Sequence, residues 1–148
     1  MNKLQLQAHY TKEGCRLKIT CDSKVVIDGT AQMVGGHLKS TYPLIAKRKG
    51  LLSQLEAVYL QDTVEALECV LSRNLHDLWI SASYRGKHAH LRMVCSGVVI
   101  LKGDAWIDGD FKNNYLPLDE RCGLIEKDCD YLNAVISTME DNVMVMDD

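Results

Sequence analysis

Two neighbouring runs of alternating residues constrain the fold of this chain more than any other feature. In LWISASY and HAHLRMVC every second residue is apolar, which is typical of strands with one buried face. The two apolar faces must lie on the same side of a sheet, and two pairing registers satisfy that condition. The register with Gly86-Lys87 as its turn is favoured, because glycine suits the first position of a type II′ turn. It places Ser81 opposite Arg92.

Similar patterns predict further strands on both sides of a helical region. They lie at residues 4–10, 15–22, 24–28, 97–101 and 105–108. The intervening residues 28–40 and 111–118 lack a clear period and predict loops. Inspection of the chain finds no internal repeat.

Two helices are predicted between the strand groups, or one kinked helix in their place. Pro43 suits a first helical position, and one face of that helix would bury Leu44, Leu51, Leu55 and Val58. Asp62 and Glu65 have the spacing of a capping box for the second helix. Its buried face would hold Val64, Leu67, Val70 and Leu71, and Asn74 is a suitable stop.

A long apolar stripe near the C-terminus predicts an amphipathic helix that begins at Asp119. Its members alternate at spacings of four and three: Leu118, Cys122, Ile125, Cys129, Leu132, Ile136, Met139, Val143 and Met146. Such a stripe either docks within one chain or forms a helix shared by a dimer. The candidate packing or dimer residues are Ile125, Cys129, Leu132, Ile136 and Met139.

The order of strands, helices, strands and a final helix predicts an α+β fold in one domain spanning residues 1–148. We expect an antiparallel sheet of roughly five to seven strands, two central helices and the long C-terminal amphipathic helix. The formal charge of −3 gives no overall basic field of the kind that nucleic-acid binders usually carry, although a local basic patch stays open.

The cysteines and the N-terminus indicate a cytoplasmic protein, in a bacterial or a host cytosol. Six cysteines are present without a CxxC pair, and most fall at apolar positions, so we expect buried free thiols. The N-terminal residues alternate in polarity and lack the apolar centre of a signal peptide. No apolar run reaches the length of a membrane span.

The polar face of the hairpin formed by LWISASY and HAHLRMVC, with the basic stretch 83–93 at its turn, is the main candidate binding surface for a protein or a phosphate. It gathers Trp79, Ser81, Arg85, Lys87, His88, His90 and Arg92. Trp79 lies within reach of Arg92 for a cation–π contact. An anion, a metal on the two histidines or a histidine base would each suit these residues, and so would an ordinary solvated sheet surface. No third metal ligand or matched nucleophile is recognisable, so no metal and no cofactor is expected.

A second cluster, Asp104, Asp108 and Asp110, offers carboxylates for acid–base chemistry. It does not fit an EF-hand loop, because Lys112 occupies the position of a required oxygen ligand. The spacing alone is unspecific.

These features favour a small non-enzymatic binding protein of the inhibitor, immunity or accessory type, acting on another protein and forming a homodimer. Its anchors would be Trp79, Trp106, Tyr84 or Arg92. The first alternative is a nucleotide or oligonucleotide binder that uses the basic hairpin 83–93. The second is a small enzyme that uses His88 and His90 or the aspartate cluster.

Overall fold

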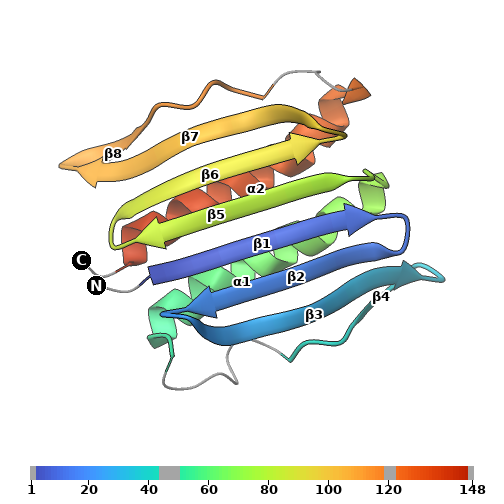
Figure 1. The fold of residues 1–148 in the computed structure, drawn as a ribbon, viewed down its shortest axis with the longest axis horizontal. Helices are drawn as coiled ribbons and strands as arrows, with labels where there is room; N and C mark the ends of the chain where they lie inside the picture. The colour runs from blue at the N-terminus through green and yellow to red at the C-terminus, as the bar shows by residue number, and fades with distance from the viewer. Residues whose placement is uncertain (1–2, 44–50, 119–122, 147–148) are drawn as a thin grey trace.

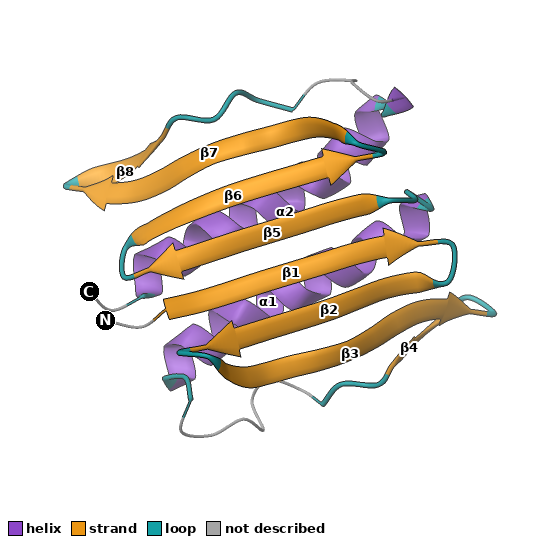
Figure 2. Cartoon of the chain, in the orientation of Figure 1, coloured by secondary structure: helices purple, strands orange, loops and turns teal. Residues whose placement is uncertain are grey.

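A computed structural model describes residues 3–43, 51–118 and 123–146 of the protein. These residues form one antiparallel sheet of eight strands, with both α-helices on the same face (Figures 1 and 2). The α+β class, the antiparallel sheet and the C-terminal helix are confirmed. The predicted strand number was too low.

The chain folds as two successive units, each of four strands followed by a helix. The elements are β1 (Lys3–Thr11), β2 (Gly14–Cys21), β3 (Lys24–Val34), β4 (His37–Ser40), α1 (Gln54–Cys69), the 3₁₀ turn η2 (Val70–Arg73), β5 (Leu78–Arg85), β6 (His88–Cys95), β7 (Val98–Asp108), β8 (Asp110–Asn113) and α2 (Glu126–Val145). In the sheet the strands lie in the order β4-β3-β2-β1-β5-β6-β7-β8 (Figure 1). The first unit therefore runs outward from the centre in one direction and the second unit in the other.

The two units are related by a local twofold axis between β1 and β5. Gln7 pairs with Ser81 at this axis, and the two residues are 74 positions apart, half of the chain. The same shift converts the β1–β2 register into the β5–β6 register, and a β-bulge follows Ile19 in one unit and Met93 in the other. The view that the chain has no internal repeat was therefore wrong. Six identical pairs are buried in both units: Leu4/Leu78, Ala8/Ala82, Tyr10/Tyr84, Leu17/Leu91, Cys21/Cys95 and Ala31/Ala105.

Both units anchor their helix to the sheet in the same way. The hydroxyl of Tyr10 donates to the Leu67 carbonyl at 2.6 Å, and that of Tyr84 donates to the Met139 carbonyl at 2.7 Å. Burial raises the pKa of both tyrosines well above the ordinary value, so both hydroxyls stay protonated as donors. A buried donor with a partner avoids the cost of an unsatisfied polar group.

Two segments predicted as loops are in fact strands at the edges of the sheet. Residues 28–40 contain the outer part of β3 and β4, and residues 110–113 form β8. All four side chains of β4 are exposed, so this edge has no covered face and no apolar alternation. Residues 102–104, which separate two predicted strands, lie within β7 (Val98–Asp108). A Cβ on Gly103 would lie 2.7 Å from the Cβ of Tyr115, which explains a glycine within a strand.

The helical region between the strand groups was assigned wrongly in detail. The described residues hold one α-helix there, α1, and Asp62 lies inside it rather than at its start. The capping box is formed by Ser53 and Glu56: the Ser53 hydroxyl accepts from the Glu56 N–H at 3.1 Å, and the Glu56 carboxylate accepts from the Ser53 N–H at 2.9 Å. Leu55 and Val58, expected in the core, are 55% and 52% exposed. Leu44 lies outside the described residues.

The end of that region follows the prediction more closely. Val64, Leu67 and Val70 are buried, and Leu71 is half-buried. Asn74 ends η2 in a left-handed conformation with φ 53°, and its N–H donates to the Leu71 carbonyl.

The C-terminal stripe packs within the chain. Leu132, Ile136 and Met139 of α2 are buried in the core, and Cys129 is 8% exposed. The helix begins at Glu126 rather than Asp119, because Gly123 has φ 76° and Ile125 is extended. Ile125 is 54% exposed, so it is a poor packing residue. Cys122 lies outside the described residues. Among the described helices, none is long and apolar enough to cross a membrane.

Candidate functional site

The candidate site is the face of the sheet that carries no helix, which we call the open face (Figure 2). Strand alternation sends the apolar side chains to the helices and the polar ones to the open face. At its centre a row of residues crosses six adjacent strands, one residue from each. The row is Asp28, Lys18, Gln7, Ser81, Arg92 and Lys102. Its five interstrand steps of about 4.8 Å make it roughly 24 Å long.

The predicted hairpin has the expected register. Gly86 has φ 57°, as a type II′ turn requires, and Ser81 lies opposite Arg92. Of the seven predicted site residues, six are on the open face: Trp79, Ser81, Arg85, His88, His90 and Arg92. Lys87 is the exception, because its ammonium group donates to the Met144 carbonyl at the end of α2, 3.1 Å away. It therefore contacts the helix layer.

The aromatic side chains of the site differ from expectation in two respects. Trp79 stacks on His9, with ring centroids 3.7 Å apart and planes inclined by 10°, and its predicted contact with Arg92 is not observed. It is still 38% exposed. Tyr84 cannot anchor a partner, because it is fully buried under α2. Trp106 is half-buried on the open face, next to His88 at a centroid distance of 6.4 Å.

Both histidines of the hairpin contact one carboxylate. Asp104 Oδ1 lies 3.0 Å from His90 Nδ1 and 3.4 Å from His88 Nε2. The hydrogen bond from His90, more than that from His88, holds the pKa of Asp104 below its ordinary range. Sequence inspection placed Asp104 with other aspartates and missed this cross-strand group, because only the β6–β7 register brings it together.

The other aspartates do not join Asp104 in a site. Asp108 pairs with Lys112 at 3.4 Å, and Asp110 lies opposite Asp108 in the β7–β8 ladder. Over residues 3–43, 51–118 and 123–146, no three His, Cys, Asp or Glu side chains are grouped as metal ligands would be. In the same ranges, no serine side chain is hydrogen-bonded to a histidine, so the geometry offers no activated serine.

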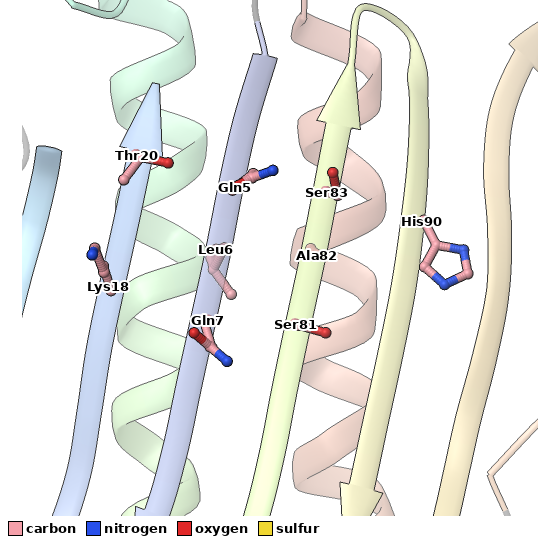
Figure 3. A pocket seen from close by; sticks show the side chains of 9 residues that line it. All are labelled: Gln5, Leu6, Gln7, Lys18, Thr20, Ser81, Ala82, Ser83 and His90. Atoms are coloured by element: carbon pink, nitrogen blue, oxygen red, sulfur yellow. The ribbon is translucent and has the colours of Figure 1, made fainter. Parts of the chain in front are cut away.

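A shallow groove of about 350 Å³ lies beside the twofold axis on the open face. The serines of β5 lower the surface, while Lys18 of β2 and His90 of β6 stand on its two sides (Figure 3). Gln5, Gln7, Thr20, Ser81 and Ser83 supply amide and hydroxyl groups between them. The groove can therefore donate and accept several hydrogen bonds to a polar ligand.

Charge is divided between the two layers of the molecule. The eight described strands carry nine lysines and arginines against four aspartates. Helices α1 and α2 carry nine carboxylates against the single Lys127. The net charge of −3 therefore conceals a cationic sheet and an anionic helix layer. A whole-chain charge could not reveal this division, because it depends on which segments become strands.

Arg92 and Lys102 form an unusual pair on the open face. They lie directly opposite each other in the β6–β7 ladder, and among the described residues neither forms an ion pair. Like charges directly across a ladder destabilise a sheet. A second such pair, Lys3 and Arg85, lies in the β1–β5 ladder. Phosphates bound at each pair on this face would relieve the repulsion within it.

Comparison with protein-family models, with curated proteins and with solved structures gives no match. The function is therefore inferred from the open face alone.

Proposed function

We propose that this protein is a non-catalytic binding protein whose open face takes single-stranded nucleic acid. The observation that carries the proposal is the pair of opposed cations, Arg92 and Lys102, on the helix-free face of a sheet whose strands carry more lysines and arginines than aspartates. The repulsion between these two cations does not stabilise the fold. It does suit phosphate binding, because lysine and arginine that neutralise phosphates release the counterions of the nucleic acid.

The aromatic residues favour single strands over duplexes. Trp79 and Trp106 lie on the open face on either side of the basic pair, and unpaired bases stack on such rings in a sequence-tolerant way. A duplex hides its base faces, and reading its major groove takes a helix or narrow ribbon that can enter it. The described part of the open face is a broad sheet. The Ser81 and Ser83 hydroxyls in the groove suit the edges of exposed bases.

The second candidate is an inhibitor or adaptor that docks an acidic protein surface on the same face. The observation in its favour is the presence of tryptophan and arginine together on an open surface, since these residues dominate binding energy at protein interfaces. Both candidates use the same cations, so they differ in the partner rather than in the site.

Fluorescence anisotropy with a labelled oligo-dT of about 20 nucleotides tests the proposal. Affinity should fall steeply with salt, with a log–log slope of about −0.7 for each phosphate contacted. Arg92→Ala and Lys102→Ala should each weaken binding and reduce that slope, whereas Lys127→Ala, which removes a cation from α2, should leave both unchanged.

Two results would overturn the proposal. One is the absence of oligo-dT binding at low salt. The other is wild-type affinity in both Arg92→Ala and Lys102→Ala. Binding of an acidic polypeptide such as poly-glutamate, without any binding of oligo-dT, would point to the second candidate.

A further inference from the structure

We infer that only the second unit of the repeat forms the nucleic-acid site, and that Asp28 disables the equivalent position in the first unit. This inference rests on the proposed function and concerns which half of the open face is used. It follows from comparing positions that the twofold axis relates.

The central row is nearly symmetric about the axis. Gln7 corresponds to Ser81, and Lys18 corresponds to Arg92, so the cations next to the axis are repeated. The ends of the row differ in sign, because Asp28 stands where the second unit has Lys102. One charge reversal therefore separates the two halves of the row.

In the first unit, the aspartate neutralises its neighbours. The Asp28 carboxylate lies 3.2 Å from the Arg16 guanidinium and directly opposite Lys18 in the β2–β3 ladder. A phosphate approaching Lys18 would therefore meet a carboxylate beside it.

In the second unit, the aspartate lies two residues further along the equivalent strand. The position equivalent to Thr30 holds Asp104, whose carboxylate contacts His90 and His88. Arg92 therefore faces a lysine instead of an acid.

The stacking residues show the same asymmetry. Trp79 corresponds to Gln5, and Trp106 corresponds to Gln32, so the first unit has no ring at either position. Directly opposed cations and stacking rings thus coincide in β5, β6 and β7, whereas the strands of the first unit carry five lysines and arginines but no tryptophan. We expect each chain to bind one single-stranded nucleic acid across β5, β6 and β7, with the first unit contributing little.

The test is a gain of binding in Asp28→Lys. This variant gives the first unit the charge arrangement of the second, so oligo-dT should bind more tightly and with a steeper salt slope, by roughly 0.7 to 1.4 if one or two phosphates are added. Asp28→Asn removes the carboxylate alone and should give a smaller gain in the same direction. Asp62→Lys makes the same charge change on α1 and serves as the matched control.

The outcomes separate the two proposals. Failure of the wild type to bind oligo-dT contradicts the proposed function itself. If the wild type binds but Asp28→Asn and Asp28→Lys bind no better than Asp62→Lys, the function stands and the inference is wrong. Circular dichroism of each variant checks that it is folded. Asp28→Asn alone decides the question if Asp28→Lys does not fold, because it changes no side-chain size appreciably.

Discussion

The opposed pair Arg92 and Lys102 should weaken the fold, and a double-mutant cycle can measure by how much. The side chains project from directly opposite positions of β6 and β7. Opposite Cβ atoms in an antiparallel pair are about 5 Å apart, and exposed charges about 6 Å apart in water repel by about 0.7 kcal/mol. Screening at physiological salt lowers this to about 0.3–0.5 kcal/mol.

The first unit supplies an internal control for this prediction. Lys18 and Asp28 occupy the equivalent opposed positions with opposite charges. Their coupling should be favourable by a similar amount, so the two cycles should differ in sign and by about 0.6–1 kcal/mol in total.

Urea unfolding followed by tryptophan fluorescence would measure the cycles Arg92→Gln with Lys102→Gln and Lys18→Gln with Asp28→Asn. Each cycle removes the contribution that a residue makes through other neighbours, such as Asp104 beside Lys102. Both coupling energies should shrink toward zero near 1 M salt. A favourable coupling between Arg92 and Lys102 at low salt would refute the reasoning, as would equal signs in the two cycles.

Three further predictions concern the fold and the histidine–aspartate group. Ser53→Ala should lower the free energy of unfolding by about 1 kcal/mol in urea melts, because it removes the cap of α1, whereas Asp62→Ala should change it by less than about 0.5 kcal/mol. Tyr10→Phe and Tyr84→Phe should each cost about 1 kcal/mol in the same assay; no loss in either would show that the repeated anchor does not stabilise the helices. The pKa of Asp104 is lowered in the folded state, so its contribution to stability is present above its unfolded pKa and lost as the pH falls through the folded one. The stability difference between wild type and Asp104→Asn should therefore shrink below about pH 4, and a constant difference would contradict this.

The sequence predicted the hairpin better than any other part of the structure. Alternation and one glycine at the turn limited the register, so Ser81 and Arg92 were paired correctly. These signals are local, and both strands pack against a helix, so one face of each strand is buried and apolar. The edge strands β4 and β8 lacked such a face and were taken for loops. Periodicity finds a strand only when one of its sides is covered.

The helix start and the repeat were missed for different reasons. Asp62 and Glu65 have the spacing of a capping box, as do Ser53 and Glu56, and spacing alone does not distinguish them. The repeat is carried by buried positions, whereas the open-face residues have changed between units, as Asp28 and Lys102 show. The basic face was hidden for a different reason: the positive charge of the strands and the negative charge of the helices offset each other in the total charge.

The central claim is that single-stranded nucleic acid binds on the open face over β5, β6 and β7. Amide and indole chemical shifts of the ¹⁵N-labelled protein, followed during a titration with oligo-dT, would map it directly. We predict the largest shifts in β5, β6 and β7, including Arg92, Lys102 and the indole N–H groups of Trp79 and Trp106, with little change along α1 and α2. Shifts confined to the helices, or no shifts at all under low-salt conditions, would contradict it.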